Sequence, residues 1–302
     1  MKSLSECIPW MAVGLAESVA IVTLNLCTML VFIRNRNLRR RSTYLMINLA
    51  VIDMFVAGVA VNYLFYRYGK DCDLWERNLI EDGAYSFLQI LLRFFVVGSL
   101  LNITTIALER VHATFRPLRH RVLKKWVYRL IIAVVWVTSG LLSVSFRLLA
   151  RFDETQDRSV SFCITFASIC LLIICASYTS IIVKVHCGAQ PQQHGTASRE
   201  RKLTMTLFIV TVVSLLLYLP RITLRYVVYI SKHEIWWLLP PSVRVHLESA
   251  FLVLFYANSL VNPILYAIRM PEYRSAFLAL FRKRPRQLRQ VVVLSLRGLR
   301  DM

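Results

Sequence analysis

The chain is poor in the residues from which many soluble enzymes build their catalytic sites. Its 302 residues include only nine glycines, and they contain no Cys-x-x-Cys pair, no cluster of histidines and no glycine-rich loop that could cradle a phosphate. These absences argue against metal-, redox- and nucleotide-dependent catalysis. The sequence therefore gives little support to an enzyme.

Hydrophobic residues, by contrast, make up 57% of the chain and raise its mean hydropathy to +0.53. A soluble domain cannot hide so large a share in its core, so a bilayer must act as the solvent. Seven apolar stretches approach the ~20 residues that a helix needs to cross hydrocarbon. We predict an all-α membrane protein, a seven-transmembrane helix bundle. The predicted spans are residues 8–33, 42–66, 83–115, 126–149, 159–186, 199–230 and 243–268.

Basic residues indicate how the bundle is oriented. Lys and Arg outnumber Asp and Glu by 37 to 17, and they crowd the segments after the first, third, fifth and seventh spans. Because basic loops stay in the cytoplasm, we expect the N-terminus outside and the C-terminus, with its basic tail at 283–302, inside. The net charge of +20 then requires no nucleic acid. Anionic lipid attracts each basic residue by ~1 kcal/mol, and an acidic partner protein would attract them as well.

The chain shows no internal boundary, and we interpret residues 1–302 as one domain. Beyond the last span, Tyr273, Phe277 and Phe281 recur at helical spacing beside basic residues. This spacing predicts a short amphipathic helix at 271–282 that lies in the membrane interface.

Each predicted span carries a polar, aromatic or proline residue at a characteristic place, and together these residues resemble the rhodopsin-like family of G-protein-coupled receptors. The resemblance covers nearly the whole chain. It implies a multi-pass receptor of the plasma membrane that passes the signal of an extracellular ligand to a heterotrimeric G protein. The matching residues are Asn25, Asn48, Asp53, Ser99, Glu109, Arg110, Trp136, Tyr178, Pro220, Asn258, Ser259, Asn262, Pro263 and Tyr266.

Arg110 lies near the cytoplasmic end of the third span and cannot lose its proton, so it requires an anion. Glu109 offers one locally, and Glu200 offers another at the base of span six, about 30 Å below Pro220 by helical rise. The resemblance implies an Arg110–Glu200 ionic lock, which opens a cleft for the G protein when it breaks. The hydroxyls of Tyr178 and Tyr266 would then line that cleft. The alternative is that Arg110 snorkels to lipid headgroups.

Asp53 lies in the middle of an apolar span, where an unpaired carboxylate is costly. Four other polar residues could surround it with oxygen atoms, which would suit a small hard cation. The resemblance implies an allosteric sodium ion, and no other cofactor is expected. The alternative is a purely structural hydrogen-bond network around a neutral Asp53. The four residues are Ser99, Asn258, Ser259 and Asn262.

The cysteines depart from the family pattern. Tyr85 stands where the family has a cysteine, 25 residues before Arg110, so the usual disulfide cannot form. Cys163 is left without that partner and could pair with Cys7 or Cys72, and spacing does not choose between them. Together with Cys170 in place of a common proline, this loss is similar to the melanocortin receptors, within a group that includes the lysophospholipid, cannabinoid and adenosine receptors.

Span six departs as well. The family's tryptophan two residues before Pro220 is Tyr218, and its phenylalanine six before is Ser214. Tyr218 can still act as an aromatic pivot. Ser214 removes bulk that separates the two states of the family, and we hypothesise that this raises basal activity. A seven-span decoy, or a dimer partner that modulates other receptors, is the alternative function that these departures keep open.

The residues at particular positions of the spans narrow the class of ligand. Amine receptors of the family carry a carboxylate where this chain has Leu92, and opsins carry a lysine where it has Tyr256. Arg93, Arg221 and Arg225 lie at a similar predicted depth and could line a site for an anionic ligand. Alternatively, these arginines snorkel outward or pair with Glu248.

Overall fold

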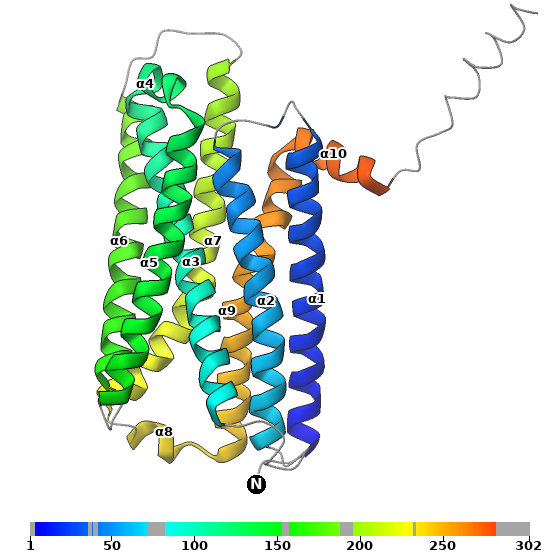
Figure 1. The fold of residues 1–302 in the computed structure, drawn as a ribbon, viewed down its shortest axis with the longest axis vertical. Helices are drawn as coiled ribbons and strands as arrows, with labels where there is room; N and C mark the ends of the chain where they lie inside the picture. The colour runs from blue at the N-terminus through cyan, green and yellow to red at the C-terminus, as the bar shows by residue number, and fades with distance from the viewer. Residues whose placement is uncertain are drawn as a thin grey trace, which may run out of the picture.

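The computed structural model shows a bundle of long helices and describes residues 4–35, 38, 42–71, 82–152, 157–187, 196–231 and 234–281 (Figure 1). The helices are α1 (Leu4–Arg34), α2 (Thr43–Asp71), α3 (Asp82–Phe115), α4 (Pro117–Val122), α5 (Lys125–Phe152), α6 (Asp157–Cys187), α7 (Thr196–Ile230), α8 (Glu234–Leu238), α9 (Pro241–Arg269) and α10 (Pro271–Phe281).

Within the described ranges, seven of these helices are long and apolar enough to cross a membrane, namely α1, α2, α3, α5, α6, α7 and α9. In hydrocarbon only a helix or a closed barrel satisfies every backbone polar group, so apolar stretches of this length fold as helices. The predicted seven-helix bundle is confirmed. Several helices run past the predicted spans, as α2 does to Asp71, because helical hydrogen bonding continues into the interface.

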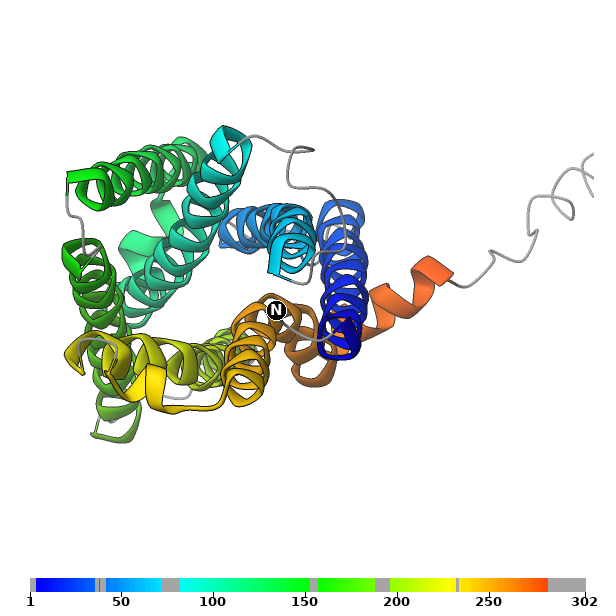
Figure 2. The ribbon, with the colours of Figure 1, turned by 90° about the horizontal axis from the view of Figure 1, so that it is seen from below.

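The helices form a ring, seen along the bundle in Figure 2. α3 makes the widest set of contacts, with α2, α5, α6 and α7, while α9 packs on α1, α2 and α7. The N-terminus lies at the same end of the bundle as α8, and α4 and α10 lie at the other end (Figure 1). The short helices thus mark the two ends of the bundle.

Hydrogen bonds donated by side chains connect α5, α2 and α3. Trp136 donates to Asn48 at 3.0 Å, Asn48 donates to Asn102 at 2.9 Å, and Asn102 donates to the carbonyl of Leu45 at 3.0 Å. Interhelical bonds of this kind average about 0.6 kcal/mol in membranes, so a relay of them fixes register more than it supplies stability. Gly98 permits the close approach, because a Cβ there would lie 3.3 Å from Ser139 Oγ.

α10 confirms the short helix predicted after the last span. Tyr273 is buried, and its hydroxyl lies 2.7 Å from Thr28 Oγ1 on α1. Burial raises the pKa of Tyr273 to about 12, so the phenol stays neutral. Leu278 and Phe281 are exposed, as expected of a helix that meets lipid. The predicted basic tail at 283–302 lies outside the described residues.

The cysteine pairing differs from our expectation. Cys7 forms a disulfide whose partner lies outside the described residues, whereas Cys163 is a free thiol. The predicted bond of Cys163 to Cys7 or Cys72 is therefore wrong. Cys163 belongs to α6 and lies near Arg93 of α3, while Cys7 belongs to α1, a helix for which no extensive packing on α6 is found.

Candidate functional site

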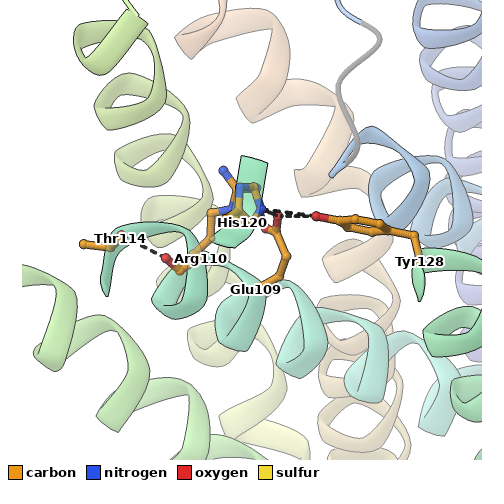
Figure 3. A network of polar contacts seen from close by, with 5 residues as sticks. All are labelled: Glu109, Arg110, Thr114, His120 and Tyr128. Atoms are coloured by element: carbon orange, nitrogen blue, oxygen red, sulfur yellow. Dashed lines mark hydrogen bonds and ion pairs between the residues drawn. The ribbon is translucent and has the colours of Figure 1, made fainter. Parts of the chain in front are cut away.

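Arg110 lies at the α4 end of α3, and its side chain is completely buried. Its nearest anion is its chain neighbour: Nε donates to Oε2 of Glu109 at 2.6 Å, and Nη2 forms an ion pair with the same oxygen. Figure 3 shows this pair with the residues around it. A buried guanidinium is tolerated because the carboxylate compensates its charge locally.

The other oxygen of Glu109 is held by two residues that the sequence did not single out. His120 Nε2 lies 2.6 Å from Oε1 and the Tyr128 hydroxyl donates to it at 3.2 Å, while Tyr128 and His120 are themselves 3.1 Å apart (Figure 3). His120 comes from α4, which begins with Pro117 at its first position, and Tyr128 comes from α5. The carboxylate of Glu109 therefore connects α3, α4 and α5.

The remaining residues predicted for the coupling switch lie on α6, α7 and α9. Tyr178 and Tyr266 are both buried in one hydrophobic cluster with Ile103 and Ile106 of α3. The Tyr266 hydroxyl has no hydrogen-bond partner in the part of the chain that the structure describes. Glu200 belongs to α7, but its side chain lies outside the described residues, so the Arg110–Glu200 lock stays a prediction.

Asp53 is fully buried in α2 and accepts three hydrogen bonds. Ser99 donates at 3.1 Å and Ser259 at 2.9 Å to Oδ1, and Asn262 donates at 2.9 Å to Oδ2. Four of the five residues predicted for the sodium cage are thus in direct contact. Oδ1 of Asn262 is buried, with no hydrogen-bond partner among the described residues. An orphaned oxygen beside a carboxylate and two hydroxyls suits a hard cation.

Asn258, the fifth predicted cage residue, turns toward α7 instead. Its Nδ2 donates to the Tyr218 hydroxyl at 2.8 Å. Tyr218 also packs edge-on against Phe255, with ring centroids 5.0 Å apart. Pro220 follows inside α7, where its missing N–H weakens the helix and permits a bend. The aromatic pivot is therefore hydrogen-bonded to α9.

The residues predicted to bind ligand divide into two groups. The Arg93 guanidinium lies 6.0 Å from the Phe146 ring of α5, and Leu92 is partly buried against the hydrophobic cluster of α1, α2 and α9. Arg221 lies 5.9 Å from the Phe255 ring, and Arg225 donates to Glu248 at 3.2 Å. Arg93 therefore does not share a site with Arg221 and Arg225, because α3 presents it to α5 rather than to α7.

Arg67 of α2 was missed by the sequence argument. Its Nη2 lies 2.5 Å from Oε2 of Glu248, so Glu248 is shared between two arginines from two helices. The position near the end of the predicted second span was the available signal, but the same position also fits a snorkelling arginine.

Seven apolar helices around buried polar networks define a multi-pass membrane protein. Comparison with known proteins identifies its family. Residues 24–266 match the family described as 7 transmembrane receptor (rhodopsin family). The chain belongs to this family of G-protein-coupled receptors, and it is a signalling receptor rather than an enzyme.

Two groups of relatives illustrate the match. The chain is 27% identical over 271 residues to the histamine H2 receptor of Cavia porcellus, covering 82% of this chain and 72% of that one. The human histamine H2 receptor gives the same figures. The lysophosphatidic acid receptor 1-A of Xenopus laevis is 26% identical over 283 residues, covering 88% of this chain and 74% of that receptor.

Proposed function

We propose that this receptor responds to an extracellular ligand by opening a cleft at Arg110, where a heterotrimeric G protein is activated. The supporting observation is the closed arrangement around Arg110: a buried arginine held by Glu109, which is itself held by His120 and Tyr128. Such a network has a second arrangement available, in which Arg110 is released and α7 moves.

The orientation belongs to the same proposal. Basic residues gather at the end of the bundle with α4 and α10, including Arg116, Arg119, Arg121, Lys124 and Lys125. By the positive-inside rule this end faces the cytoplasm and the N-terminus faces outside. The Arg110 network then lies where a G protein can reach it.

A sodium ion is the regulator that the Asp53 network fits best. Asp53, Ser99, Ser259 and Asn262 would hold it, and its charge would stabilise the arrangement in which α2, α3 and α9 converge. Asn262 would contribute the buried Oδ1 that lacks a partner within the described chain. Without the ion, three donors already satisfy the carboxylate.

The relatives are named for ligands of opposite charge, histamine and lysophosphatidic acid. Leu92 supplies no carboxylate for an amine, and Glu248 is occupied by Arg67 and Arg225. Excess guanidinium groups support a ligand that carries a negative charge.

The test is ligand-free dissociation of G-protein heterotrimers in cells, measured for the wild type and Arg110→Ala at equal surface expression. We expect a basal signal in the wild type that Arg110→Ala loses. The control Arg119→Ala, which changes an exposed residue of α4, should retain it. Equal signals from wild type and Arg110→Ala, or silence of both across the main α-subunit classes, would contradict the proposal. Silence combined with an altered response of a co-expressed receptor would favour the decoy or dimer-partner alternative.

A further inference from the structure

Three arginines surround a single glutamate in the half of the bundle that lies toward α8. Glu248 of α9 bonds to Arg67 of α2 at 2.5 Å and to Arg225 of α7 at 3.2 Å. Arg221 lies one helical turn before Arg225 and interacts electrostatically with Arg225, Glu248 and Arg67. Arg67 and Arg225 each contact one oxygen of the carboxylate, so a single negative charge faces three guanidinium groups.

Arg221 is the member of this cluster with unmatched charge. Its Nη1 is buried and finds no hydrogen-bond partner among the residues that the structure describes. Its neighbours are the Phe255 ring and Tyr256, which is buried. Glu17 of α1 also acts electrostatically on Tyr256, but no ion pair joins Glu17 to Arg221 in the described chain.

Arg221 is only partly exposed, with Nη1 buried, and it cannot remove the problem by losing its proton, because arginine stays charged in proteins. An unpaired buried charge is among the costliest features that a fold can carry. Glu248 carries one negative charge, and that charge is shared with Arg67 and Arg225, so it cannot balance Arg221 as well. An external anion relieves the deficit without breaking either bond.

We propose that Arg221 anchors the anionic group of the ligand, a carboxylate or a phosphate, and that Glu248 is the resident counter-ion which holds Arg67 and Arg225 in place beside it. This assignment rests on the proposed receptor function and narrows its ligand. Planar guanidinium groups bind both kinds of anion in a bidentate manner. Arg93, which faces Phe146, takes no part in the site.

The same arginine lies next to the pivot of α7. The Arg221 guanidinium contacts Phe255, Phe255 packs against Tyr218 with ring centroids 5.0 Å apart, and Tyr218 accepts the hydrogen bond of Asn258. An anion bound to Arg221 therefore acts on α7 at the residue that follows Pro220. These contacts connect the anchor through Phe255 to Tyr218 and Asn258.

Binding is tested on the full-length receptor in nanodiscs by thermal unfolding with three probes of similar body, benzoate, phenyl phosphate and benzylamine. Ligand linkage raises the unfolding midpoint by several degrees at about 100 times Kd. We expect one or both anions to raise the midpoint of the wild type and of Arg93→Gln, and benzylamine to leave it unchanged. Arg221→Gln should lose the anion effect. An anion effect that persists in Arg221→Gln, or no anion effect in the wild type, overturns the proposal.

The midpoints of two variants without ligand make the proposal independent of probe choice. Arg221→Met removes the unmatched charge and keeps the bulk, so it should raise the midpoint of the receptor without ligand. Glu248→Gln removes the counter-ion of Arg67 and Arg225 and should lower the midpoint while increasing anion affinity. A lower midpoint for Arg221→Met would show that Arg221 is already satisfied. Basal G-protein dissociation measured in parallel separates this result from failure of the receptor function.

Discussion

Nδ2 of Asn258 on α9 donates a hydrogen bond of 2.8 Å to the hydroxyl of Tyr218 on α7, and both side chains are buried. The family's tryptophan could not form this bond, because an indole N–H only donates. The tyrosine thus ties two helices together, two residues before the proline at which α7 can bend.

Tyr218→Phe should raise basal G-protein dissociation about threefold at equal surface expression. The substitution keeps the ring against Phe255 and removes only the acceptor, which costs the resting state roughly 0.6 kcal/mol if the bond has the average strength measured in membranes. Tyr226→Phe, which alters an exposed tyrosine of the same helix, is the control. If the two variants share the basal signal of the wild type, the hydroxyl does not hold the resting state.

His120→Ala should also raise basal signalling. Without the imidazole, Glu109 loses its 2.6 Å contact with α4. The interaction between α3 and α4 is then weaker. A double-mutant cycle with Glu109→Gln identifies the cause, because His120→Ala should then have little further effect. Additive effects of the two substitutions would place the action of His120 elsewhere. Arg119→Ala, one residue earlier and exposed, should behave as the wild type.

Asp53→Asn should abolish any dependence of thermal stability on sodium. The substitution removes the negative charge to which the ion would bind but preserves an oxygen that Ser99 or Ser259 can donate to. Midpoints are compared in sodium chloride and in choline chloride at equal ionic strength. Glu17→Gln changes another partly buried carboxylate of the membrane region and should retain the sodium effect. A wild type that unfolds at the same temperature in both salts would leave Asp53 with a structural role alone.

The spans were predictable because a bilayer imposes length and polarity on every helix. Asp53 stood out as a carboxylate in an apolar span, whereas Ser99, Ser259 and Asn262 were recognised from the resemblance to the family. The rotation of each helix about its own axis was harder to predict from the sequence. Arg93 and Arg221 share a predicted depth but point to different neighbours. Arg67 reaches Glu248 from a position near the end of the second span that equally fits a snorkelling arginine. His120 depends on the short α4 turn that Pro117 begins. Side-chain partners across helices follow from packing, which no single span encodes.

Ser214 is 1% exposed, and its Oγ has no hydrogen-bond partner within the residues described. The sequence suggested that a small residue here weakens the resting packing. Restoring bulk should then lower basal G-protein dissociation, more in Ser214→Phe than in Ser214→Val.

Ser214→Ala also separates polarity from volume. It deletes a buried, unsatisfied hydroxyl without adding bulk, so it should stabilise the receptor by about 1 kcal/mol, or a few degrees in the unfolding midpoint, with basal activity close to the wild type. Overpacking is the competing effect, since extra methylenes in a filled core typically cost 1–3 kcal/mol. It would appear as a lower midpoint for Ser214→Phe. A variant that keeps its midpoint and surface expression but shows no fall in ligand-free signalling would contradict the link between the missing phenylalanine and basal activity.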